Sequence, residues 1–274
     1  MSFQCSGEQL IGILTAPVKP TEYGVVIVVG GPQFRIGSHR QFVLLARSLG
    51  ERGITTLRFD CRGMGDSSGE LRDFTAIDED IRAAVDTLQN AHPKLERIVL
   101  WGLCDAASAS LFYAHKDPRI AGMVLANPWV RTDEGEAQAY LNHYYRARFF
   151  DKAFWKKILR GQYDFLASLR SFFEMIRQAM RTNSPTVEAR ELPLRERMYA
   201  SWANFKGEVL VLLSGEDLTA KEFSSMVKAS SQWRELFDGP CVTKHNLLLA
   251  NHTFSREEWR DEVAKVTGNW ILAL

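Results

Sequence analysis

The sequence predicts an α/β fold built on one mostly parallel β-sheet with helices on both faces, in a single domain of 274 residues (1–274). Continuous apolar runs rich in β-branched residues alternate with segments of helical period, a pattern typical of strands buried on both faces. Hydrophobic residues make up 46% of the chain and charged residues 24%. A chain of this length and composition can bury one sizeable core.

The elements follow in order along the chain. Residues 3–16 read as an antiparallel hairpin. Six later apolar runs are predicted strands, at 23–30, 54–60, 97–103, 122–127, 208–214 and 242–249. Five segments of helical period supply the crossovers that parallel strands require, at 38–52, 77–90, 105–115, 219–231 and 255–274.

One long segment, at about 129–205, contains no predicted strand and is crowded with aromatic and basic residues. We interpret it as a helical cap insertion. Its aromatic side chains could line a pocket for an apolar substrate group, although at helical spacing such residues more often pack the inserted helices against each other.

Composition argues against several classes of partner. Lys and Arg total 34 against 33 Asp and Glu, so a net charge of +1 creates no field that attracts nucleic acid. The sequence has neither a signal peptide nor an apolar run of membrane-spanning length, which predicts a cytoplasmic protein. The four cysteines form no CxxC pair or disulfide framework, so we expect reduced thiols, no metal and no cofactor.

The most informative motif is Trp101-Gly-Leu-Cys-Asp-Ala-Ala-Ser108, where an apolar strand gives way at once to a helical pattern. This is the setting of a nucleophile elbow, whose central residue is strained and needs small neighbours two positions away. Gly102 and Ala106 satisfy that need, and Cys104 becomes the candidate nucleophile. A helix N-terminus and a nearby His both lower a thiol pKa. The alternative is that Cys104 is a small buried hydrophobe.

A nucleophile of this kind needs a base and an orienting acid from loops after later strands. Asp217 follows the strand at 208–214 and His252 follows the strand at 242–249. We therefore predict a triad of Cys104, His252 as the base and Asp217 as its orienter. Asp217 could instead cap the helix that follows it, and Glu216 is the nearest rival as the acid.

Acyl transfer also needs donors for an oxyanion, normally the amide after the nucleophile and one in an earlier strand-exit loop. Those positions correspond to Asp105 and to Gly31, with Gln33 as the second choice in the same loop because Pro32 has no amide. Gln33 and His39 are further candidates for substrate binding. The Gly-Gly-Pro stretch could equally be an ordinary tight turn.

Several segments together resemble the α/β-hydrolase superfamily over nearly the whole chain: FDCRGMGDSSG at 59–69, GLCDAAS at the elbow, the GED loop and NHTF. More narrowly, GGPQFRIGSHRQFVLLARSL, WGLCDAAS and NPWVRT resemble the exosortase A system-associated hydrolases of type 1. This resemblance implies a hydrolase fold, a cysteine at the elbow, a bacterial cytoplasmic setting, and a link to exopolysaccharide or exosortase machinery. By matching position it also implies the triad of Cys104, Asp217 and His252.

The sequence thus favours an ester or thioester hydrolase that acts on a small-molecule acyl substrate through an acyl-cysteine intermediate. An acyltransferase to a saccharide or other hydroxyl acceptor would use the same residues. A non-catalytic scaffold of the same fold is a third reading, because fold does not dictate function. Redox sensing at Cys104 would need a resolving thiol, and neither Cys61 nor Cys241 is evidently placed for it.

Overall fold

The computed structural model describes residues 1–31, 33–131 and 192–274. The chain divides into two compact units, one made of Met1–Val130 with Leu194–Leu274 and the other of Arg131–Pro193. Every helix and strand that the structure describes lies in the first unit.

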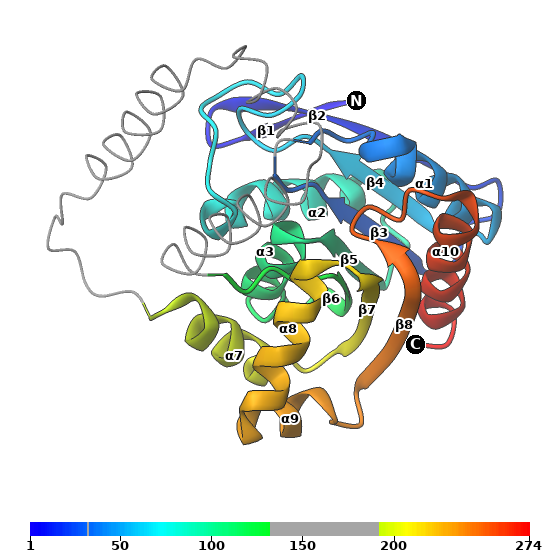
Figure 1. The fold of residues 1–274 in the computed structure, drawn as a ribbon. Helices are drawn as coiled ribbons and strands as arrows, with labels where there is room; N and C mark the ends of the chain where they lie inside the picture. Colours follow the sequence, from blue (N-terminus) through cyan, green and yellow to red (C-terminus); the bar gives the residue numbers. More distant parts are fainter. Residues whose placement is uncertain (32, 132–191) are drawn as a thin grey trace, which may run out of the picture. The chain divides into compact units, whose positions relative to one another are not determined.

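An eight-stranded sheet forms its centre, in the order β1-β2-β4-β3-β5-β6-β7-β8 (Figure 1). β1 and β2 form an antiparallel hairpin, β2 runs antiparallel to β4, and all the remaining pairs are parallel. The strands are β1 (Ser2–Cys5), β2 (Glu8–Thr15), β3 (Tyr23–Val28), β4 (Thr55–Phe59), β5 (Arg97–Leu103), β6 (Ile120–Ala126), β7 (Glu208–Glu216) and β8 (Val242–Asn251). The mostly parallel sheet and the N-terminal hairpin confirm the prediction.

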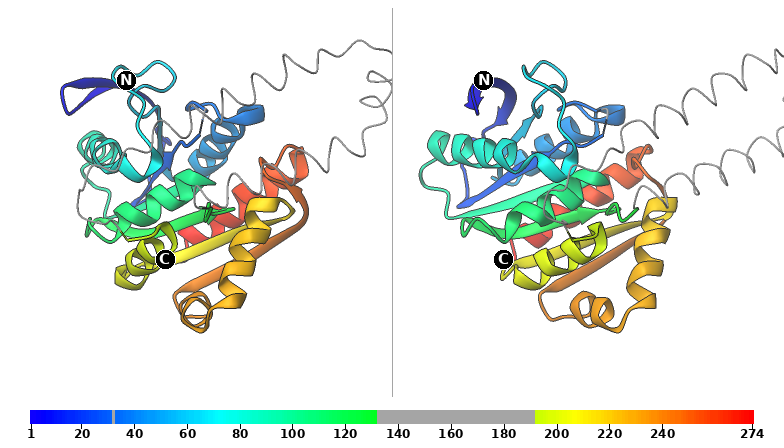
Figure 2. Two further views of the ribbon diagram at one scale, coloured as in Figure 1. Left: turned by 60° about the vertical axis from the view of Figure 1, so that its left-hand side comes forward. Right: turned by 90° about the vertical axis from the view of Figure 1, so that its left-hand side faces the viewer.

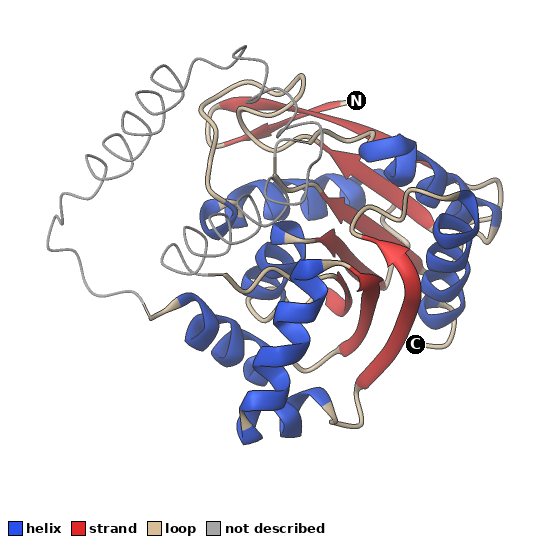
Figure 3. Ribbon diagram, viewed as in Figure 1, coloured by secondary structure: helices blue, strands red, loops and turns tan. Residues whose placement is uncertain are grey.

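Helices cover both faces of the sheet, so β3 and β4 are buried along their whole length (Figure 3). α1 (Gln41–Glu51) and α10 (Glu257–Ile271) pack side by side on one face. α2 (Asp78–Ala91) and α3 (Asp105–Ala114) lie on the other face, and α7 (Leu194–Asn204) packs against α3 (Figure 2). α8 (Leu218–Ala229) and α9 (Ser231–Phe237) connect β7 to β8. Two short 3-10 turns, η1 (Ser38–Arg40) and η2 (Phe74–Ala76), complete the elements.

Two helix boundaries differ from the prediction for a reason that the backbone angles show. The helix expected at 38–52 begins only at Gln41, because His39 and Arg40 adopt left-handed backbone angles (φ 54° and 59°). The helix expected at 219–231 is divided at Ser230, whose backbone is extended. The Ser230 hydroxyl accepts a hydrogen bond from the amide of Trp233 (3.4 Å), so it caps α9 instead of continuing α8.

The cap predicted at about 129–205 lies mostly outside the described residues. Of that range, α7 is described, and its Met198 and Trp202 are buried in the first unit. Among the helices that the structure describes, none is long and apolar enough to cross a membrane.

Candidate active site

The turn between β5 and α3 has the geometry of a nucleophile elbow. Cys104 has φ 63° and ψ −124°, a combination that costs about 1–3 kcal/mol for a residue with a side chain. Gly102 must lack a side chain, because a Cβ there would lie 2.4 Å from the Ala106 carbonyl oxygen. The small residue expected two positions before Cys104 is therefore required by the turn.

Backbone hydrogen bonds hold the strained residue from both sides. The Cys104 amide donates to the Ala126 carbonyl at the end of β6 (2.9 Å), and the Trp129 amide donates to the Cys104 carbonyl (3.2 Å). The thiol side chain is half-buried, whereas Cys5 and Cys61 are buried and Cys241 is exposed. The elbow thus presents Cys104 at the carboxyl end of β5, the edge where ligands bind in open α/β sheets.

Asp217 and His252 meet at the same edge, after β7 and β8. Asp217 Oδ2 lies 3.0 Å from His252 Nδ1, with the aspartate almost buried and the imidazole one-third exposed. The contact is within ion-pair distance, although the ring N–H is not aligned for an ideal hydrogen bond. Such bonds are often poorly aligned without substrate. The structure therefore brings the predicted base and orienting acid together.

Asp217 has a second role at the start of α8. Its two carboxylate oxygens accept hydrogen bonds from the amides of Thr219 (3.3 Å) and Ala220 (3.0 Å), so it is also the helix N-cap. Burial disfavours the charged carboxylate, but the His252 imidazole and these two amides outweigh it and lower the pKa of Asp217. Glu216, the rival acid, is exposed and lies 3.9 Å from Lys221.

Asn127, which the sequence analysis did not select, connects the parts of this site. It directly follows β6, is fully buried, and has a left-handed backbone (φ 44°). Its side-chain nitrogen donates to Ser214 Oγ (2.9 Å) and to the His252 carbonyl (3.2 Å), and its oxygen accepts from the Ser214 amide (2.8 Å). Asn127 therefore ties the His252 loop to β7. The only local signal is an Asn-Pro pair after an apolar strand, which is typical of any turn.

Gly31 and Asp105, the residues predicted to supply the oxyanion donors, lie together, but the Gly31 amide faces the Asp105 carboxylate. The Gly31 amide donates to Asp105 Oδ2 (2.7 Å), and the Ala106 amide donates to Asp105 Oδ1 (2.9 Å). Burial raises the pKa of Asp105, while the amides of Gly31, Ala106 and Asp105 itself oppose that rise. In this structure the Gly31 amide is thus already engaged.

The other two predicted residues occupy the loop before α1. Gln33 is partly buried, and its side-chain oxygen has no hydrogen-bond partner among the described residues. His39 is exposed. Arg35 anchors this loop through ion pairs with Asp60 and Asp66. In the part of the chain that the structure describes, no group of three or more His, Cys, Asp or Glu side chains could hold a metal ion.

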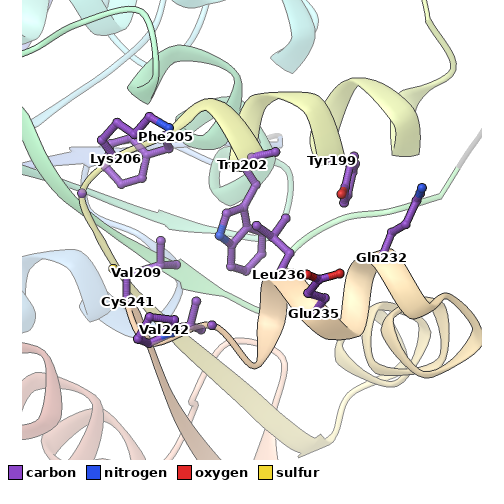
Figure 4. A pocket seen from close by; sticks show the side chains of 14 residues that line it. Tyr199, Trp202, Phe205, Lys206, Val209, Gln232, Glu235, Leu236, Cys241 and Val242 are labelled. Carbon is purple, nitrogen blue, oxygen red and sulfur yellow. The ribbon is translucent and has the colours of Figure 1, made fainter.

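A pocket of about 400 Å³ lies away from these residues (Figure 4). It is bounded by α7, α9 and the segments leading into β7 and β8, and its walls include Trp202, Leu236, Val209 and Val242. Asp217 and His252 follow the opposite ends of the same two strands. This pocket therefore does not serve the candidate nucleophile.

The fold, with candidate residues after its parallel strands, defines a class of protein, and a family comparison identifies it. Residues 25–266 match the family model described as the alpha/beta hydrolase family, so the chain belongs to that family.

Curated relatives are similar over shorter stretches. An uncharacterized protein of Pseudomonas aeruginosa is 33% identical over 111 residues, which cover 39% of this chain and 29% of the relative. A polyketide transferase of a Penicillium species is 34% identical over 94 residues, 31% of each chain. The matches thus span about three tenths of the length of either relative.

Solved structures resemble the whole chain at low identity. An esterase of Pyrococcus furiosus aligns with a TM-score of 0.68 at 14% identity, over 100% of this chain and 89% of its own. Est1E of Butyrivibrio proteoclasticus, solved with ferulic acid bound, aligns with a TM-score of 0.64 at 18% identity, over 100% and 98% of the two chains. These likenesses confirm the α/β-hydrolase fold.

Proposed function

We propose that this protein hydrolyses ester or thioester bonds of a small acyl substrate with Cys104 as its nucleophile. The observation that carries the proposal is the strained elbow at Cys104, together with the Asp217–His252 pair at the same edge of the sheet. Strain of this kind persists only where surrounding contacts enforce it, and it is concentrated at functional sites.

In the proposed reaction His252 accepts the Cys104 proton, and the sulfur attacks the substrate carbonyl carbon. A carbon–sulfur bond forms while the carbonyl electron pair moves onto oxygen, which the amides of Asp105 and Gly31 stabilise. The tetrahedral intermediate collapses, and the leaving alkoxide or thiolate takes the proton from His252. Water, deprotonated by His252, then attacks the acyl-cysteine and releases the acid and the free thiol. Asp217 orients the His252 ring throughout.

Intact-protein mass spectrometry after exposure to p-nitrophenyl acetate and short acyl thioesters tests this proposal. We expect the wild type to gain one acyl group and turn over, whereas Cys104→Ala gains none and His252→Ala acylates at least roughly 100-fold more slowly. Cys241→Ser is the matched control because it removes the exposed thiol and should behave as wild type. If Cys104→Ala reacts as fast as the wild type, or no protein reacts, the proposal fails and a non-catalytic scaffold becomes the better explanation.

A second candidate is acyl transfer to an alcohol, favoured by the similarity of 94 residues to a polyketide transferase. The acyl-cysteine would be the same, and a hydroxyl oxygen would replace water in the second half-reaction. The resemblance to exosortase-associated hydrolases makes a saccharide hydroxyl the acceptor to try first. Product analysis with and without acceptor alcohols separates the two, because a transferase forms the new ester in preference to the free acid.

A further inference from the structure

The Asp105 side chain lies where the proposed reaction needs an empty oxyanion hole. Its carboxylate accepts the Gly31 amide at 2.7 Å, and its own amide, the other proposed donor, also favours the charged form of the same carboxylate. A carboxylate oxygen and a tetrahedral oxyanion are both negatively charged acceptors and take up the same amide donors. The resting enzyme thus contains its own mimic of the oxyanion.

The loop after β3, which contains Gly30 and Gly31, is shaped to fit this carboxylate. A Cβ on Gly30 would lie 2.1 Å from Asp105 Oδ1 and 2.7 Å from the Ala106 nitrogen, so no side chain can replace the glycine while Asp105 stays in place. Gly31 has φ +58°, which turns its amide toward Asp105 at little strain only because it is glycine. The two glycines are therefore matched to Asp105.

The surroundings of Asp105 do little to stabilise its charged form. The carboxylate of Asp73, on the loop before η2, raises the pKa of Asp105, and burial raises it more. Cys61, on the loop after β4, is buried and feels the Asp105 charge in turn, and Cys104 precedes Asp105 at the start of α3. Within the described residues no cationic side chain forms a salt bridge with Asp105. The charged form thus depends on amide hydrogen bonds alone.

Building on the proposed hydrolysis, we propose that Asp105 is a positioning residue that controls access to the oxyanion hole. Its carboxylate occupies the Gly31 amide in the resting enzyme, and the substrate oxygen takes over that amide once the carboxylate has turned away.

Asp105→Asn is the direct test. The variant keeps the size of the side chain, but its amide accepts weaker hydrogen bonds and cannot accept from Gly31 and Ala106 through both heavy atoms. For a neutral ester at pH 8 we expect kcat/KM to rise by roughly 10-fold, which corresponds to about 1.4 kcal/mol. Asp73→Asn is the matched control: it removes one nearby negative charge, leaves the Gly31 amide untouched, and should stay within about 3-fold of wild type.

The pH profile separates this role from a merely structural one. In the ratio of kcat/KM between Asp105→Asn and wild type, pH effects that are common to both proteins cancel. The ratio should fall toward one as the pH falls through the Asp105 pKa, because protonation then weakens the hold on Gly31 in the wild type. A structural role would give a ratio that does not change with pH.

An amide resonance provides a readout without turnover. In ¹⁵N-labelled full-length wild type, the Gly31 amide proton should lie downfield and titrate with Asp105, and it should move upfield in Asp105→Asn. If Asp105→Asn folds poorly, Asp105→Ser is the second variant, and the same gain in kcat/KM is expected. A ratio of kcat/KM that does not change with pH, or equal acylation rates of Cys104 in wild type and both variants, would overturn this inference and leave the hydrolase proposal standing. Absence of acylation in every protein would instead refute the hydrolase proposal and this inference with it.

Discussion

Asp217 contacts both a helix and the candidate base, so two substitutions separate its roles. Asp217→Asn retains a side chain that caps helices as well as aspartate does, but it replaces the carboxylate that lies 3.0 Å from His252 Nδ1. Asp217→Ala removes both functions. Glu216→Gln is the matched control, because this neighbouring carboxylate is exposed and makes no contact with the base.

The contacts of Asp217 set the expected size of each effect on stability and activity. Alanine deletes the hydrogen bonds to the amides of Thr219 and Ala220, a loss of about 1 kcal/mol in the free energy of unfolding. Asparagine has one acceptor oxygen, so it retains one of these two hydrogen bonds and loses the charge at the helix N-terminus, which is worth about 0.3–1 kcal/mol. Both should lower kcat by roughly 10²–10⁴-fold, because an unoriented imidazole takes the wrong tautomer.

The difference in the free energy of unfolding between wild type and Asp217→Asn should also depend on pH. The pKa of Asp217 is lowered in the folded protein, so its charged form stabilises the fold above the unfolded-state pKa of about 3.9. That contribution is lost as the pH falls through the lowered pKa. The gap between wild type and Asp217→Asn should therefore be full at pH 6–8 and shrink below about pH 4.

Urea unfolding followed by circular dichroism measures the stabilities, and acylation of Cys104 measures the activity. If Asp217→Asn keeps the wild-type kcat and Asp217→Ala is only less stable, then Asp217 does not orient the base. Asp217 would then be a helix cap only, and a loss of activity in Glu216→Gln would make Glu216 the orienting acid.

Three further predictions follow from buried polar groups. Asn127→Ala loses three hydrogen bonds within the site, so urea unfolding should show a loss of about 3 kcal/mol, and kcat should fall with it. Asp80→Asn leaves the buried Arg62 guanidinium poorly paired, and a destabilisation of about 3–5 kcal/mol is expected; a change below 1 kcal/mol would contradict it. Burial raises the pKa of the Cys61 thiol well above its usual range, so peptide mapping should show iodoacetamide labelling of Cys61 only after unfolding.

Much of the architecture could be predicted from local patterns. Buried parallel strands read as continuous apolar runs, and the crossovers read as helical periods, so the sheet and its flanking helices followed from the sequence. The elbow at Cys104 was also visible, because its steric demand for Gly102 and Ala106 falls within five residues. Helix boundaries were less predictable where a side chain competes with the backbone, as at Ser230.

The candidate site shows which features could not be predicted from the sequence. The sequence by itself determined that Cys104, Asp217 and His252 follow strands of one parallel sheet, because strand direction places their loops at the same edge. Only the tertiary structure decided what those loops contact: Asn127 bridges to the His252 loop 125 residues away, and Asp105 reaches the Gly31 amide across 74 residues. Such contacts depend on how separate loops meet in space, and no local period or spacing encodes that meeting.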